Sequence, residues 1–150
     1  MAICPTCGRT EPGKTRSLED HKRYFAIFKA LWNHLPEEWA SEFSSQEDAR
    51  KFFQIKAGYF DRISIKLDGA DPASAVVLAE AAMRAAGAYA KARVMDGADG
   101  KELVVFRPQS IRFSSMDQRA FSDLRTKVEI AIETETGLKI EDLLKAADAP

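Results

Sequence analysis

Apolar residues recur at three- and four-residue steps in four segments of this chain, the spacing expected of one helix face. They predict helices over about 17–34, 45–57, 72–87 and 115–136. The third segment is rich in alanine and apolar on more than one side, which predicts either packing on two partners or a later insertion. A shorter pattern predicts a final helix over Ile140–Ala146.

Apolar and polar positions alternate in the segments between these helices, as expected of half-buried strands. Tyr59–Leu67 alternates around its apolar residues. Tyr89–Met95 and Glu102–Phe106 flank a loop of Asp, Gly and Ala, which predicts a hairpin. Pro108 interrupts the second hairpin run, and Ser110–Phe113 resumes it. The pattern therefore predicts an α+β fold with about four main helices and a small antiparallel sheet.

The domain organisation follows from where the periodicity begins and ends. Residues 1–16 lack it and predict a flexible arm that carries a Cys-x-x-Cys motif. Residues 17–146 are predicted to form a single α+β domain, and 147–150 a frayed tail. A chain of 150 residues with 45% hydrophobic and 30% charged residues has the size and composition of one folded domain.

Charge and cysteine content narrow the possible partners and the cellular compartment. The net charge is −1, so attraction to nucleic acid requires a local basic patch. We find no signal-peptide pattern, and the longest apolar stretch is interrupted by Glu80 and Arg84, so we expect no membrane span. Only two cysteines occur, which favours a reducing compartment, the cytoplasm.

The arm contains Cys4 and Cys7, whose spacing lets two thiolates bind one zinc ion. A structural zinc site needs four ligands, and His21 is the nearest further candidate. Two chains in a homodimer could instead supply both cysteines twice. The third alternative is an arm without metal.

A basic surface is predicted near the N-terminus, from Arg16, Lys22, Arg23 and Lys29. These residues could contact phosphates, and Tyr24 or Trp32 could stack on bases if exposed. The alternative is that the charges are only the solvated face of the first helix.

Two motifs carry a resemblance. The segment 16–21 reads Arg-Ser-Leu-Glu-Asp-His, and 108–118 reads Pro-Gln-Ser-Ile-Arg-Phe-Ser-Ser-Met-Asp-Gln. Both resemble a bacteriophage or prophage family of unknown function that carries a Pro-x-Ser-Ile-x-Phe-x-x-Met-Asp motif. The first segment also resembles the phage recombination protein family NinB, which binds single-stranded DNA. The resemblance implies a phage-encoded protein in a bacterial host.

Three functions remain open from the sequence. The first is an accessory protein that binds nucleic acid, with single-stranded DNA in recombination or replication preferred. The second is a protein-binding module that inhibits or redirects a host complex, such as a defence system. The third is a small metal-dependent hydrolase or nuclease. No nucleophile elbow or phosphate-binding glycine loop occurs, so we expect binding rather than catalysis.

Overall fold

The computed structural model describes residues 18–111 and 116–148, and their contacts form two compact units. The helical unit holds the described residues up to Ala57 and from Ser110 onward. The sheet unit is Gly58–Gln109. The predicted arm over 1–16 lies outside the described residues. The prediction of a single domain over 17–146 stays a prediction, because two compact units can still unfold as one cooperative domain.

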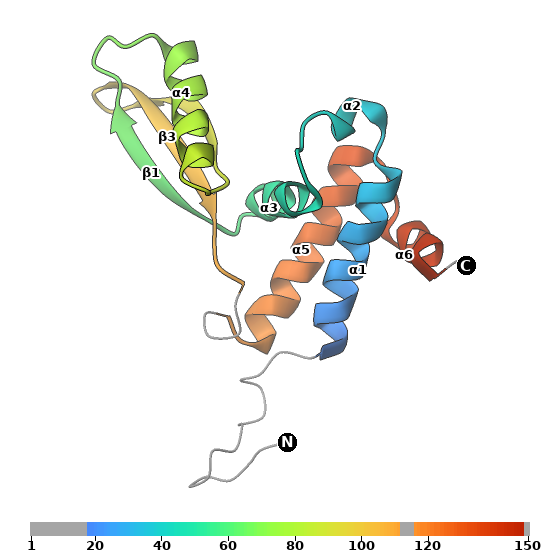
Figure 1. The fold of residues 1–150 in the computed structure, drawn as a ribbon. Coiled ribbons are helices and arrows are strands. Elements are labelled where there is room, and N and C mark those ends of the chain that lie inside the picture. The colour runs from blue at the N-terminus through green and yellow to red at the C-terminus, as the bar shows by residue number, and fades with distance from the viewer. Residues whose placement is uncertain (1–17, 112–115, 149–150) are drawn as a thin grey trace, which may run out of the picture. The chain divides into compact units, whose positions relative to one another are not determined.

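The helical unit is built around two long helices that lie side by side, as Figure 1 shows. Its helices are α1 (Leu18–His34), α2 (Glu37–Ala40), α3 (Gln46–Lys56), α5 (Gln118–Thr136) and α6 (Ile140–Asp148). Helix α6 packs on α1, and α3 contacts both α1 and α5. Fully buried side chains fill the space between them: Tyr24, Ile27, Phe28, Leu31, Phe53, Phe121, Leu124, Val128 and Ile132.

The ends of these helices follow local chemistry. Ser45 precedes α3, and its side chain accepts a hydrogen bond from the Asp48 N–H at 3.1 Å. Gly137 ends α5 with a φ of 76°, a conformation that glycine adopts without strain. The start predicted for this helix near residue 115 lies outside the described residues, and α5 begins after Asp117, whose carboxylate accepts from the Ala120 N–H at 2.9 Å.

Helix α2 was not predicted from the sequence, because four residues are too few to show a period. Its Trp39 ring lies 5.8 Å from the ring of Phe52 and 5.9 Å from that of Phe53 in α3. Phe43, in the loop after α2, joins the same aromatic cluster. The short helix is therefore held by ring packing rather than by its own length.

The sheet unit is a three-stranded antiparallel sheet with one helix. Its elements are β1 (Phe60–Lys66), α4 (Pro72–Ala85), β2 (Lys91–Gly97) and β3 (Gly100–Pro108). The strand order is β1-β3-β2, so β1 and β2 are the two edges. Pro108 is the last residue of β3, and Ser110 and Ile111 lie in no strand. The predicted continuation of that run over Ser110–Phe113 is thus wrong for the described positions.

Helix α4 packs on β2 and β3, where Leu103 and Val105 are buried beneath it. The other sides of α4 are exposed, so the prediction that it packs on two partners is wrong within the sheet unit. The half-burial predicted for β1 is also wrong for Ile63 and Ile65, which are 45% and 50% exposed. Both lie on the strand that α4 leaves uncovered.

The fold class predicted from the sequence is confirmed. Four longer helices, the short α2 and α6, and a small antiparallel sheet make an α+β fold. None of the helices within 18–111 and 116–148 is long and apolar enough to cross a membrane.

Candidate nucleic-acid interface

The basic residues predicted on α1 fall into two groups. Lys22 and Lys29 are exposed, and their seven-residue spacing puts them on nearly the same side of the helix. Tyr24, proposed as a base-stacking ring, is only 1% exposed, and Trp32 is half-buried. Tyr24 therefore belongs to the core, and the half-buried Trp32 is the remaining candidate ring on α1. Arg16 lies outside the described residues.

Arg23 forms a bidentate ion pair with a carboxylate of α5, so its charge is already engaged within the helical unit. Its Nε and one terminal nitrogen each donate to a carboxylate oxygen of Glu129 at 3.0 Å. Arg125 donates to the same carboxylate at 2.6 Å, and its Nε lies 3.3 Å from a carboxylate oxygen of Asp20. The hydrogen bonds to Glu129 raise the pKa of Arg23 above its ordinary value. This network joins α1 to α5, so Arg23 is mainly a structural residue.

His21, the third predicted zinc ligand, is packed among aromatic rings. Its ring centroid lies 4.8 Å from that of Phe25 and 6.0 Å from that of Phe121. Cys4 and Cys7 lie outside the described residues. Among the residues that the structure describes, no three His, Cys, Asp or Glu side chains gather as a metal site would require. Zinc binding therefore stays a prediction about the arm.

The resembled motif at 108–118 makes fold-building contacts at its described positions. Met116 is buried in the core, and Asp117 caps α5. The Gln118 side-chain amide donates to an Asp20 carboxylate oxygen at 2.6 Å, which ties the start of α5 to the start of α1. These residues maintain the helical unit rather than form a separate site.

The ladder register of the sheet brings together cationic residues that no sequence motif had marked. Arg62 of β1 and Lys91 of β2 both pair with Phe106 of β3, from opposite sides. Opposite residues of an antiparallel pair point to the same face. The buried partners of α4, Leu103 and Val105, alternate with Phe106 along β3. Arg62, Lys91 and Phe106 therefore share the sheet face opposite α4.

Two arginines lie over the central ring of this face. The guanidinium carbon of Arg93 is 5.5 Å from the centroid of Phe106, and that of Arg62 is 5.9 Å away. Phe60 meets Phe106 edge to face, with ring centroids 4.9 Å apart. Both distances from the guanidinium carbons fall within the reach of a cation–π contact, about 6 Å. We call these residues, with Lys91, the arginine–phenylalanine face.

The arginines of this face are available for a ligand. Arg62 and Arg93 are exposed, and within the described part of the chain neither forms an ion pair with a carboxylate. Lys91 lies at the β2 edge, 3.8 Å from the Glu80 carboxylate. A strand pattern alone could have suggested that Arg93 alternates with the partly buried Ala92 and Val94. Only the register could place it beside Arg62.

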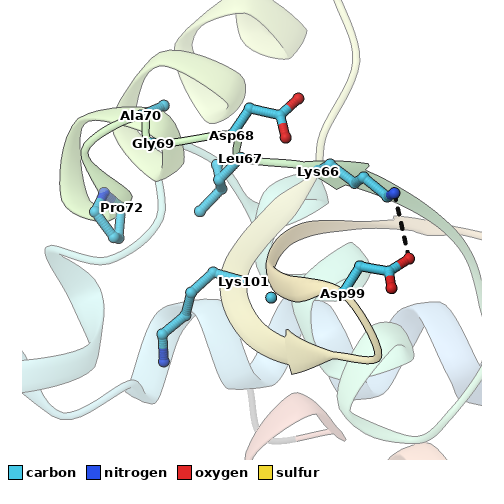
Figure 2. A pocket seen from close by; sticks show the side chains of 9 residues that line it. Lys66, Leu67, Asp68, Gly69, Ala70, Pro72, Asp99 and Lys101 are labelled. Carbon is cyan, nitrogen blue, oxygen red and sulfur yellow. Dashed lines mark ion pairs between the residues drawn. The ribbon is translucent and has the colours of Figure 1, made fainter.

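A hollow at the other end of the sheet is less suited to a ligand (Figure 2). Its volume is about 260 Å³, below the roughly 300–1,000 Å³ of ordinary ligand sites. Lys66 pairs with Asp99 at 3.3 Å, and Lys101 pairs with Asp96 at 2.7 Å. In Figure 2 the amino groups of Lys66 and Lys101 point in different directions. The cations there are paired and do not converge on one point.

Comparison with known proteins gives no match to a protein family, a curated protein or a solved structure. A proposal about function therefore rests on the arrangement of the chain's own side chains.

Proposed function

We propose that the protein binds single-stranded nucleic acid on the arginine–phenylalanine face of its sheet. The observation that carries the proposal is the pair Arg62 and Arg93, which are exposed and have no carboxylate partner among the described residues. Both lie over the buried ring of Phe106. Sheets that bind single strands combine aromatic rings with cations on the face away from their helices. Guanidinium groups serve both roles, because they stack on bases and donate to phosphates.

This proposal keeps the function expected from the sequence and moves its location. The sequence places the contacts on α1, where Arg23 is bonded to Glu129 and only Lys22 and Lys29 remain exposed. On the sheet, two exposed arginines lie over the ring of Phe106, which is itself 9% exposed, so the guanidinium groups rather than the ring face a ligand. With a net charge of −1, such a local grouping is what attraction to phosphates requires.

The biological setting of the proposal comes from the resemblance alone. A phage-encoded accessory role in recombination or replication, in the cytoplasm of a bacterial host, is part of the same proposal. The protein-binding module and the hydrolase stay alternative predictions. The expectation of binding rather than catalysis stays a prediction.

Fluorescence anisotropy with a labelled single-stranded oligothymidylate at low salt tests the location. We expect the double variant Arg62→Glu and Arg93→Glu to weaken binding at least about tenfold, because phosphate contacts are lost and repulsion is added. The control is Lys22→Glu with Lys29→Glu, which changes the net charge equally on α1. We expect that control to weaken binding less than about threefold.

Three results would count against the proposal. Equal losses in the two double variants would mean that only net charge matters. A larger loss in the α1 variant would return the site to the surface predicted from the sequence. Failure of the unmodified protein to bind the oligonucleotide at low salt would remove nucleic acid as the ligand.

A further inference from the structure

The two edges of the sheet differ in how their backbone groups are protected. At the β2 edge, the Ala92 N–H donates to a carboxylate oxygen of Glu80 at 2.7 Å. Lys91 lies 3.8 Å from the same oxygen. A side chain from α4 thus covers an outward backbone donor of this edge and adds charge to it. Such devices prevent an edge strand from pairing with another chain.

The β1 edge is covered at its start, where the Gln109 side-chain amide donates to the Phe60 oxygen at 3.4 Å, but its middle is open among the described residues. The Leu67 N–H donates to the Lys101 oxygen, and the Tyr59 oxygen accepts from the Gln109 N–H, so odd-numbered residues of β1 bond to β3. The even-numbered residues between them direct their N–H and C=O groups outward. Among the described residues, those of Arg62 and Ser64 meet no partner.

Apolar side chains line the same edge. Ile63 and Ile65 lie on the α4 side of the sheet, opposite Val105 and Leu103, yet they are 45% and 50% exposed. Leu78 of α4 is 71% exposed. It lies about 200° around the helix from Glu80, which faces β2, so Leu78 flanks the β1 side. An unpaired edge beside exposed isoleucines is the arrangement that binds an added strand.

We infer that the β1 edge pairs with the β1 edge of a second copy of this chain, in antiparallel orientation about a two-fold axis at Ile63. In this register all seven residues of Phe60–Lys66 find a partner. Ile63 meets its own copy, and Arg62 faces Ser64 of the other chain. No like charges stand directly opposite each other.

The neighbouring registers are disfavoured by charge. Moving the axis to Arg62 sets that arginine against its own copy. Moving it to Ser64 sets Arg62 against Lys66 on both sides of the axis. Like charges directly opposite each other destabilise a strand pair. The charges of β1 therefore select the register that also pairs the whole strand.

Single cysteines test both the pairing and its register, in a background of Cys4→Ser and Cys7→Ser. In the inferred register the two Ile63 positions form a non-hydrogen-bonded pair, with Cα atoms about 4.5 Å apart. That spacing suits a disulfide, which needs roughly 4.4–6.8 Å. The two Ile65 positions are four residues apart along the strands, about 13 Å. Ile63→Cys should therefore form disulfide-linked dimers under mild oxidation, and the equally exposed Ile65→Cys should not.

Native mass measurement of the full chain completes the test. The serine background should have twice the 16.7 kDa mass of one chain, because the pairing needs no cysteine. Ile63→Lys should convert it to a folded monomer, since Ile63 is already partly exposed within one chain. Its melting temperature should lose the dependence on protein concentration that a dimer shows. This outcome does not depend on nucleic-acid binding.

Several outcomes would overturn the inference. A dimer that needs Cys4 and Cys7 would point to the arm as the interface. Linking through Ile65→Cys instead of Ile63→Cys would contradict the register. A monomeric background protein, or one that uses this edge only for a different protein, would rule out the second copy.

Discussion

The two units of the molecule use arginine in opposite ways. In the helical unit, Arg23 and Arg125 share the Glu129 carboxylate and hold α1 against α5. In the sheet unit, Arg62 and Arg93 lie on an aromatic ring and have no carboxylate partner among the described residues. The same residue type therefore stabilises one unit and remains available for a ligand in the other. Counting basic residues along the chain cannot separate these roles.

Among the changes that test this difference between the units, we expect the largest loss of stability at Glu129. Its side chain is 16% exposed and accepts from two arginines, so Glu129→Ala leaves Arg23 without that partner and weakens the hold on Arg125. We expect a loss of about 2–3 kcal/mol in the free energy of unfolding, measured in urea by circular dichroism. Affinity for the oligonucleotide should not change.

Asp99→Ala is the matched control in the sheet unit. Asp99 also pairs with a cation, Lys66, but its side chain is 74% exposed. Exposed pairs contribute little, so we expect a loss below about 0.5 kcal/mol. Similar losses in the two variants would show that the Glu129 network is an ordinary surface feature.

The next largest loss of stability is expected for Val105→Ala, which tests whether the two units unfold together. Val105 is 6% exposed beneath α4, and Val105→Ala should destabilise the sheet by about 2 kcal/mol. Both tryptophans, Trp32 and Trp39, lie in the helical unit. If residues 17–146 form one domain, tryptophan fluorescence and circular dichroism should report the same shifted urea transition.

Val77→Ala gives the control for this measurement, since it removes the same atoms from a side chain that is 69% exposed. We expect it to change the free energy of unfolding by less than about 0.5 kcal/mol. A Val105→Ala transition that circular dichroism detects and tryptophan fluorescence misses would mean that the units unfold independently.

Local features of the fold were predictable because they depend on neighbouring residues. Ser45 and Gly137 mark helix ends by the chemistry of a cap and of a left-handed turn. The hairpin between β2 and β3 follows from its Gly- and Asp-rich loop. Alternation of apolar residues also predicted that β1 is a strand.

Long-range pairings were not predictable from the same patterns. The exposure of Ile63 and Ile65 depends on which strands α4 covers, and alternation does not specify that. Arg23 finds its carboxylate 106 positions away. Arg62 and Arg93 meet at Phe106 only through the register of two ladders. The candidate site therefore emerged from the structure, although its chemistry was expected.

The smallest effect at neutral pH concerns Tyr24, a buried polar residue of the helical unit. Burial raises the pKa of Tyr24 to about 12, opposed in part by the nearby charge of Arg50. Arg50 is close enough to lower this pKa, but within the parts of the chain that the structure describes no donor or acceptor meets the geometry of a hydrogen bond to the Tyr24 hydroxyl. Tyr24→Phe should thus change the free energy of unfolding by less than about 1 kcal/mol at pH 7.

The difference in stability between Tyr24→Phe and the unmodified protein should grow at alkaline pH, and its sign follows from the protons that each state binds. In the unfolded chain the Tyr24 phenol loses its proton near pH 10, whereas in the folded chain it keeps the proton up to about pH 12. Between these values the folded state binds more protons, so stability falls as pH rises. Tyr24→Phe removes this loss and should be more stable than the unmodified protein by about 2 kcal/mol near pH 12. Parallel urea unfolding curves for both proteins from pH 9 to 12 would measure it. Curves that keep the same separation at every pH would show that Tyr24 ionises as easily in the folded chain as in the unfolded one.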